Sequence, residues 1–228
     1  LLAADDAPPR VALVALPGLA EPGEVGPPGG VAPTAALSPG GDPAAIPAVA
    51  EGRARVQDEG SQLAALALSR ARQVRPGERW LDLCAGPGGK AALLAAEARL
   101  GGALLEANEL IPSRAGLVRR AVAVVRPAPV VHEGDGVAFA NAHPATFGRI
   151  LLDAPCTGLG ALRRRPEARW RKQPSDLAAL TVLQARLLDA AVAALAPGGL
   201  LAYVTCSPHL AETRAQVADG LRRESRGE

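Results

Sequence analysis

Short apolar runs and stretches of helical periodicity alternate along the chain from residue 56 onwards. The apolar runs predict strands at 79–84, 103–107, 129–132, 149–152 and 200–205. Ala- and Leu-rich stretches with helical spacing predict helices at 61–71, 90–98, 113–122, 177–195 and 211–221. Strands that alternate with helices in this way predict an α/β fold with a doubly wound, mostly parallel sheet.

The first 50 residues have a different texture, rich in Pro, Gly and Ala. Only 11–16 predicts a strand there, because Pro-Gly turn signals interrupt the rest. We expect residues 1–50 to form a short irregular appendage or connector, the remnant of a preceding domain, and residues 51–228 to form the main domain. The chain begins with Leu1 and contains no Met, so we also expect it to be a piece of a longer protein.

Composition limits the cellular compartments and the kinds of partner that fit this chain. No apolar run approaches the roughly 18–20 residues that span a bilayer, and no signal peptide is visible. The three cysteines are widely spaced without a CxxC pair, which argues against a metal site or a disulfide framework. Free thiols indicate a reducing cytoplasm. The net charge of +2 does not by itself indicate a nucleic-acid-binding protein.

Basic residues nevertheless gather in one segment, where only Glu167 opposes them: Arg163, Arg164, Arg165, Arg169, Arg171 and Lys172. Such a run is either a solvated loop or a phosphate-binding surface. Its position beside the motifs described next favours phosphate binding.

A glycine turn at 82–90 (DLCAGPGGK) follows a predicted strand and opens a helix. This arrangement lets a ligand approach backbone N–H groups at a helix N-terminus, and alone it fits a dinucleotide, a nucleotide or no ligand. The spacing is not GxGxxG, and Asp82 at the strand end would repel a pyrophosphate. Asp82 better suits a ligand with a positive amino group, such as S-adenosylmethionine, which also carries a sulfonium.

Two more acidic residues follow the next two strands. Glu109 is placed to accept the hydroxyls of a ribose, and Asp135 to meet an adenine amino group. Each could instead be an ordinary loop acid or helix cap. Three carboxylates at the ends of successive strands favour a common ligand site.

Cysteines follow the last two strands, in 153–158 (DAPCTG) and 205–208 (TCSP). Open α/β sheets place their sites at these carboxyl ends. A buried cysteine is usually inert, and Cys84 fits that interpretation about as well as a ligand contact. Cys156 and Cys206 fit it poorly and are candidates for chemistry.

Four segments together resemble the motifs of one family: 56–62 (VQDEGSQ), 82–90, 152–158 (LDAPCTG) and 203–207 (YVTCS). They are similar to the RNA cytosine-carbon-5 methyltransferases, and most of all to the bacterial RsmB (Fmu/Sun) group. The resemblance runs from about residue 42 to about residue 220. It implies a Rossmann-like class I S-adenosylmethionine-dependent methyltransferase fold, with the catalytic domain at 51–228.

The resemblance also implies roles for individual residues. Glu109 would bind the ribose of S-adenosylmethionine and Asp135 its adenine, while Asp153 would line both the cofactor and cytosine sites. Cys206 would be the nucleophile, and Cys156 would assist product release. The cofactor loop would comprise Cys84, Ala85, Gly86, Pro87, Gly88, Gly89 and Lys90. The partner would be RNA, above all 16S ribosomal RNA, and we expect a cytoplasmic monomer without metal or membrane contact.

The implied chemistry requires a thiolate at Cys206, because carbon-5 of cytosine is a poor nucleophile until a nucleophile adds to carbon-6. Arginines or Lys90 are candidates for lowering the pKa of Cys206. Asp153 would meet the N3/N4 edge of the base. For His209 an exposed loop position is the favoured interpretation. Trp170 and Tyr203 are candidates for stacking on bases, with core packing favoured for Tyr203.

Alternatives remain open at this stage. A small-molecule methyltransferase would need the carboxylates but not two placed cysteines, and a non-catalytic RNA-binding or ribosome-assembly module would need neither Cys206 nor an intact cofactor loop. A cysteine hydrolase lacks an obvious histidine partner. Transfer RNA is a second possible substrate. The N-terminal, often NusB-like, domain of the family is absent here, and the last strands of its sheet are expected to be missing.

Overall fold

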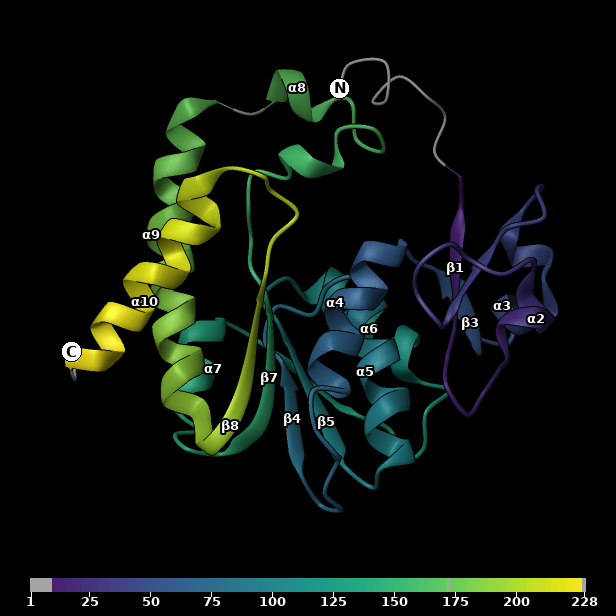
Figure 1. The fold of residues 1–228 in the computed structure, drawn as a ribbon, viewed down its shortest axis with the longest axis horizontal. Coiled ribbons are helices and arrows are strands. Elements are labelled where there is room, and N and C mark those ends of the chain that lie inside the picture. The colour runs from purple at the N-terminus through teal and green to yellow at the C-terminus, as the bar shows by residue number, and fades with distance from the viewer. Residues whose placement is uncertain (1–9, 172, 227–228) are drawn as a thin grey trace.

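A parallel sheet forms the centre of the molecule (Figure 1). The computed structural model describes residues 10–171 and 173–226, and in this part of the chain five strands pair in the order β6-β5-β4-β7-β8, every pair parallel. The strands are β4 (Arg79–Asp82), β5 (Leu104–Glu109), β6 (Val130–Glu133), β7 (Phe147–Asp153) and β8 (Leu195–Val204). The predicted doubly wound parallel sheet is confirmed.

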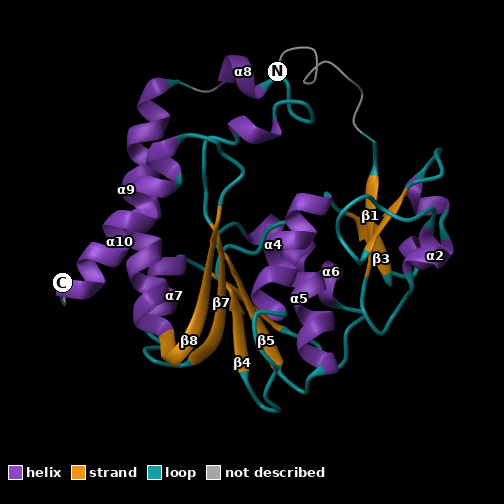
Figure 2. Cartoon of the chain, in the orientation of Figure 1, coloured by secondary structure: helices purple, strands orange, loops and turns teal. Residues whose placement is uncertain are grey.

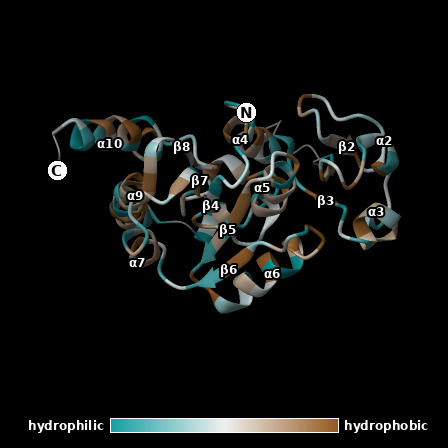
Figure 3. Ribbon diagram, turned by 90° about the horizontal axis from the view of Figure 1, so that it is seen from below, coloured by the Kyte–Doolittle hydropathy of each residue, from teal (hydrophilic) through white to brown (hydrophobic). Residues whose placement is uncertain are grey.

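Helices cover both faces of this sheet (Figures 1 and 3). One face carries α4 (Glu59–Ser69), α5 (Gly89–Leu100) and α6 (Pro112–Val122), and the other carries α7 (Gly136–Asn141) and α9 (Pro174–Ala194), against which α10 (Arg214–Arg226) packs. Successive side chains of a strand point to opposite faces. Trp80 and Leu151 therefore enter one core, and Leu81 and Leu152 enter the other.

The transition from α9 to β8 differs from the sequence prediction. The strand was predicted at 200–205, but α9 ends at Ala194, one residue before its predicted end, and β8 starts directly at Leu195. The strand therefore takes in Pro197, Gly198 and Gly199. The three residues form an irregularity inside β8, where the pairing with β7 shifts register between Phe147 and Arg149. Gly198 supports this bend with a φ of 70°, a conformation that glycine adopts without strain.

By length and composition, α9 would also suffice to cross a membrane, which the sequence analysis did not anticipate. It has 21 residues and a mean hydropathy of 1.5 over the most apolar window. In the structure it packs against α7, α10 and the sheet, burying Leu187, Leu188 and Ala191. The core helix of a folded domain passes the same test, although only 33% of the most apolar window of α9 is buried in the structure.

The N-terminal region is more regular than predicted. From residue 10 onwards it contains a separate antiparallel sheet with the strand order β2-β1-β3 (Figure 2). Its elements are β1 (Ala12–Ala15), α2 (Pro22–Val25), β2 (Ala35–Leu37), the 3₁₀ helix η1 (Pro43–Ala45), α3 (Pro47–Ala50) and β3 (Ala54–Val56). The prediction of an irregular segment was wrong because the Pro-Gly signals mark turns between very short strands. The small sheet also continues past residue 50.

Buried polar contacts join the small sheet to the large domain. The Gln62 amide donates to the carbonyls of Leu13 (3.2 Å) and Gln57 (3.0 Å) and accepts from the Thr34 hydroxyl (2.7 Å). Gln62 is fully buried, so this network is shielded from water. It fixes the segment around Gln57, which leads into α4, against the main domain.

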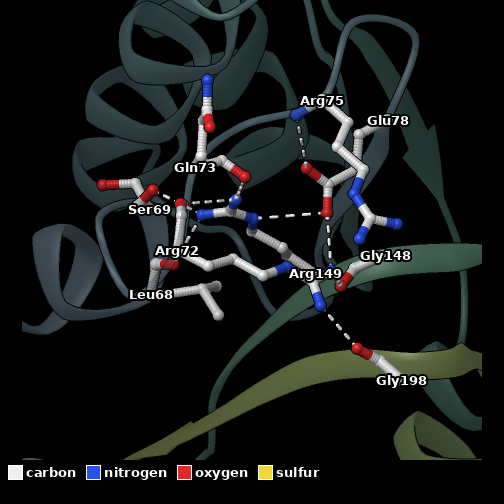
Figure 4. A network of polar contacts seen from close by, with 9 residues as sticks. All are labelled: Leu68, Ser69, Arg72, Gln73, Arg75, Glu78, Gly148, Arg149 and Gly198. Atoms are coloured by element: carbon white, nitrogen blue, oxygen red, sulfur yellow. Dashed lines mark hydrogen bonds and ion pairs between the residues drawn. The ribbon is translucent and has the colours of Figure 1, made fainter.

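A second buried network surrounds Arg149 on β7 (Figure 4). Its side chain is fully buried, and the guanidinium lies over the Trp80 ring at 4.6 Å. It also pairs with Glu78 at 3.4 Å. Its remaining N–H groups donate to carbonyls at and beyond the C-terminal end of α4, those of Leu68, Ser69, Arg72 and Gln73. Because the last carbonyls of a helix lack intrahelical partners, Arg149 satisfies acceptors that would otherwise be buried without one.

Replacing Arg149 by Met should therefore lower the free energy of unfolding by about 3–5 kcal/mol, the usual cost of removing one partner from a buried charged network. The change leaves the four carbonyls without their Arg149 donor, while Glu78 keeps its ion pair with Arg72. Urea denaturation followed by circular dichroism measures the loss. The matched control is Arg75→Met, at an exposed position nearby, which should change stability by no more than about 0.5 kcal/mol. A loss below about 1 kcal/mol for Arg149→Met would contradict the capping role.

Candidate active site

The two candidate cysteines meet at the carboxyl end of the large sheet. Strands β7 and β8 are parallel neighbours, with Asp153 opposite Val204, so the loops that follow them leave the sheet side by side. The sulfur atoms of Cys156 and Cys206 are 3.5 Å apart. The backbone N–H of Gly160 donates to the carbonyl of Cys206 at 2.8 Å and ties the two loops together. The structure thus joins residues that lie 50 positions apart in the chain.

The contact makes the two thiols unequal. The pKa of Cys206 is lowered to about 6, first by the hydrogen bond from Cys156 and also by the nearby Lys90 charge, against the opposing effects of burial and Asp153. The pKa of Cys156 is raised, first by its hydrogen bond to Cys206 and then by burial. These opposite shifts favour the thiolate at Cys206 and the thiol at Cys156. Lys90 was a predicted cause, but the larger effect of Cys156 was not anticipated.

Alkylation should reveal this difference directly. Only the thiolate reacts, so the rate of Cys206 modification by iodoacetamide should rise as the pH passes the lowered pKa, with a midpoint near about 6. Cys84 should react slowly throughout, because burial raises its pKa. Mass spectrometry of digested samples assigns the label to each cysteine. A Cys206 midpoint near the ~8.5 of a free thiol would contradict the thiolate assignment.

A salt bridge stands beside the thiols. The Lys90 Nζ lies 2.7 Å from the Asp153 Oδ2, and it also contacts the Ser61 hydroxyl at 3.3 Å. Lys90 comes from the first turn of α5 and Asp153 from the end of β7. The structure therefore links the glycine loop to the cysteine loops through one ion pair, and it keeps the Asp153 carboxylate in an acceptor role.

The glycine loop is tightly packed and needs its glycines. Gly88, the N-cap of α5, has a φ of 101°, and a Cβ there would lie 2.6 Å from the Ala121 side chain. A Cβ on Gly86 would lie 2.3 Å from the Glu109 Oε2. Glu109 itself accepts from the N–H of Gly86 (2.9 Å) and of Ile111 (3.0 Å). Glu109 thus braces the loop, and its contact with a ribose stays a prediction.

Two unpartnered polar side chains lie at this loop. Within residues 10–171 and 173–226, neither oxygen of the fully buried Asp82 has a hydrogen-bond partner, and neither polar atom of the Gln57 amide has one. Burial is the main cause that raises the pKa of Asp82 to about 8. The Gln57 amide lies 3.7 Å from the Cβ position of Gly89. An unsatisfied acid beneath a glycine loop fits a ligand with amino and sulfonium groups. A positively charged ligand nearby would lower this raised pKa and stabilise the ionised form of Asp82.

Two other sequence-predicted residues serve as caps. Asp135 follows β6 and caps α7, accepting from the Ala138 N–H at 2.8 Å. This is the capping interpretation that the sequence left open, and an adenine contact remains a prediction. His209 is exposed and accepts from the Ala211 N–H at 3.1 Å through Nδ1, which confirms the exposed loop position.

The basic segment lies beyond the carboxyl ends of the strands, around α8 (Ala168–Arg171; Figure 1). Trp170 is 75% exposed there, and Arg164 pairs with Asp58 at 3.0 Å. Lys172 lies outside the described residues.

Tyr203 packs against the core of β7 and α9, as favoured from the sequence, and its hydroxyl donates to the Glu212 carbonyl at 2.9 Å. Among the described side chains, no group of three potential metal ligands occurs.

The sequence analysis missed Glu212, a fully buried acid in the 3₁₀ helix η3 (Leu210–Glu212). Its carboxylate accepts from the Thr157 N–H at 2.8 Å and from the Gln184 amide at 3.1 Å. An acid a few residues after Cys206 looks like the solvated start of a helix. Only the fold brings it under the cysteine loops.

The parallel sheet, its glycine loop and the acids at successive strand ends define a class I S-adenosylmethionine-dependent methyltransferase. The chain belongs to the 16S rRNA methyltransferase RsmB/F family, whose model matches residues 70–228. The expected membership in the RsmB group is thereby confirmed.

Individual relatives agree with this membership. The chain is 52% identical over 229 aligned residues to Rv1407 of Mycobacterium tuberculosis, a predicted methyltransferase, covering 98% of this chain and 49% of that protein. It is 41% identical over 170 residues to ribosomal RNA small subunit methyltransferase B of Pseudomonas syringae, covering 73% and 36%. The crystal structure of PH0851 superposes with a TM-score of 0.81 at 27% identity, covering 93% and 50%. The chain spans about half or less of the length of these relatives.

Proposed function

We propose that this chain is the catalytic domain of an RNA (cytosine-5-)-methyltransferase that acts on 16S ribosomal RNA in the cytoplasm through a covalent cysteine–cytosine intermediate. The observation that carries the proposal is the 3.5 Å contact between the sulfurs of Cys206 and Cys156 at the carboxyl end of the sheet, which lowers the pKa of Cys206 and raises that of Cys156. A small-molecule methyltransferase has no use for such a pair. The name of the Pseudomonas relative, a small subunit ribosomal RNA methyltransferase, supports the substrate.

The first half of the reaction uses the Cys206 thiolate. Its sulfur forms a bond to carbon-6 of cytosine, and the electron pair of the 5,6 double bond makes carbon-5 nucleophilic. The Asp153 carboxylate, held by Lys90, accepts a hydrogen bond from the exocyclic amine and orients the ring. Bound S-adenosylmethionine supplies the methyl group that carbon-5 takes.

The second half removes the carbon-5 proton and breaks the carbon–sulfur bond, returning the electron pair to Cys206. Cys156 suits the role of proton acceptor. Its pKa is raised mainly by the hydrogen bond to Cys206, and this cause disappears once Cys206 is bonded to carbon. The thiol of Cys156 therefore loses its own proton to solvent more easily at the stage when a base is needed, and its thiolate then accepts the carbon-5 proton. Proton removal and release of Cys206 regenerate the starting pair.

The target base must leave its stack to reach the sulfur. The exposed Trp170 and the basic segment around it offer a stacking surface and phosphate contacts beyond the same end of the sheet. Three exposed arginines there, Arg163, Arg165 and Arg171, supply positive charge.

Identification of the methylated nucleoside tests the proposal. Naked 16S ribosomal RNA and, in parallel, transfer RNA are incubated with the chain and S-adenosylmethionine labelled in its methyl group, then digested to nucleosides. The proposal predicts label in 5-methylcytidine from the 16S RNA. Label in another nucleoside would contradict the carbon-5 target, and label only in the transfer RNA arm would contradict the ribosomal substrate. Calorimetric binding of S-adenosylmethionine without any transfer would favour a non-catalytic module.

A further inference from the structure

One buried carboxylate sits between the two cysteine loops. Glu212 accepts hydrogen bonds from the backbone N–H and the hydroxyl of Thr157, at 2.8 and 2.5 Å. Thr157 immediately follows Cys156. The Thr157 hydroxyl also lies 3.2 Å from the hydroxyl of Ser207, which immediately follows Cys206. The side chain of Glu212 is therefore linked to the residue directly after each candidate catalytic sulfur.

Residues of α9 and β8 hold Glu212 in place. The fully buried Gln184 on α9 donates to Glu212 at 3.1 Å and to the Pro155 carbonyl at 2.8 Å, just before Cys156. The Tyr203 hydroxyl on β8 donates to the backbone carbonyl of Glu212 at 2.9 Å. The donors that reach the Glu212 side chain itself come from Thr157 and Gln184, and an acceptor surrounded by donors suits an ionised carboxylate.

The charge state agrees with this donor set. Burial alone would raise the pKa of Glu212, but the hydrogen bonds from Ser207, Thr157 and Gln184 outweigh it and hold the pKa below its usual value. Buried charges that accept several hydrogen bonds are rigid, because each bond that is lost leaves an unsatisfied group away from water.

We infer that Glu212 is a positioning residue that holds the loops after β7 and β8 together and so keeps the sulfurs of Cys156 and Cys206 in contact. This inference deepens the proposed function and rests on it for its catalytic meaning. Glu212 does not touch the reacting atoms; it acts through Thr157 and Ser207. Its consequence is measurable without RNA, because the contact between the sulfurs sets the reactivity of Cys206.

The first test is Glu212→Gln, which keeps the shape of the side chain but presents an NH₂ group to donors. The Thr157 hydroxyl must then turn to accept from this NH₂ group instead of donating, and the negative charge that attracts the other donors is lost. Both changes weaken the hold on the two loops, so the sulfurs should separate. We expect the pH midpoint for iodoacetamide modification of Cys206 to rise by about one unit or more, toward the ~8.5 of a free thiol. Glu224→Gln, at an exposed position on α10, is the matched control and should leave the midpoint unchanged.

A second pair of variants keeps the test decisive if Glu212→Gln does not fold. Thr157→Val removes the hydroxyl that bridges Glu212 and Ser207 but keeps the backbone N–H, so the midpoint should rise in the same direction by a smaller amount. Thr157→Ser keeps the hydroxyl and should restore the wild-type midpoint. A general loss of stability would not be reversed by this smaller side chain, so the rescue separates positioning from folding.

The outcomes distinguish this inference from the proposed function. An unchanged Cys206 midpoint in a folded Glu212→Gln, or in Thr157→Val where Glu212→Gln does not fold, would overturn the positioning role whatever happens to methyl transfer. A raised midpoint together with loss of methyl transfer at pH 7 and partial recovery at higher pH would support both. A raised midpoint in a chain whose wild type transfers no methyl group to RNA would uphold the positioning role and reject the proposed function.

Discussion

Replacement of Cys206 by Ala should lower the rate of methyl transfer to RNA by about 10³-fold or more, as removal of a catalytic nucleophile does in other enzymes. Alanine cannot form the bond to carbon-6, so carbon-5 remains a poor nucleophile. The side chain is exposed at the carboxyl end of the sheet, and its loss should leave the fold intact. The initial rate of transfer from labelled S-adenosylmethionine measures the effect.

Binding provides the control for this variant. Cys206→Ala keeps the glycine loop and the Lys90–Asp153 ion pair, so the affinity for S-adenosylmethionine, measured by calorimetry, should equal that of the wild type. A loss of rate with unchanged affinity places the defect in the chemical step. A variant that keeps a rate within about tenfold of the wild type would show that another group attacks the base.

Replacement of Cys156 by Ala should have the second large effect, the accumulation of a covalent complex between the protein and RNA. The variant can still form the bond from Cys206 to carbon-6 but lacks the group assigned to removing the carbon-5 proton. A denaturing gel with labelled RNA shows the complex as a band of low mobility. The wild type should show little of it, because release follows each transfer.

The pH of this experiment matters. Cys156 is the main cause of the lowered pKa of Cys206, so its removal also makes Cys206 less ionised at neutral pH. The complex should therefore form slowly at pH 7 and faster near pH ~8.5, where an unassisted thiol is about half ionised. If no complex forms at either pH while methyl transfer continues, Cys156 has no part in product release.

The main sheet was predictable because its signal is local. The strands are buried on both faces and stand out as apolar runs, for example at Ile150 and Leu152, and the helices between them are Ala- and Leu-rich. Of the small N-terminal sheet only β1 was predicted, at 11–16, and β2 and β3 were missed because they have three residues each, too few for a period to show. The start of β8 was misplaced because Pro197-Gly198-Gly199 indicates a break, but the structure uses these residues as a bend within β8.

The site was predictable to the extent that motifs lie at strand ends. That rule brought Cys156, Cys206 and Asp153 to one edge of the sheet, and the structure shows the first two in contact. The position of motifs at strand ends could not identify Glu212, because its hydrogen-bond partners come from distant parts of the chain. Nor did it reveal that Cys156 tunes the pKa of Cys206, because this depends on a 3.5 Å contact that only the fold creates.

The most direct test of the central claim is to trap the covalent intermediate and locate its bond. RNA that carries 5-fluorocytidine at the target position has no carbon-5 proton to remove, so the complex formed in the presence of S-adenosylmethionine cannot resolve. Digestion with protease and nuclease followed by mass spectrometry should yield a peptide in which Cys206 carries the modified nucleotide. A nucleotide bonded to Cys156, or methylated RNA without any bonded peptide, would contradict the assignment of Cys206 as the nucleophile.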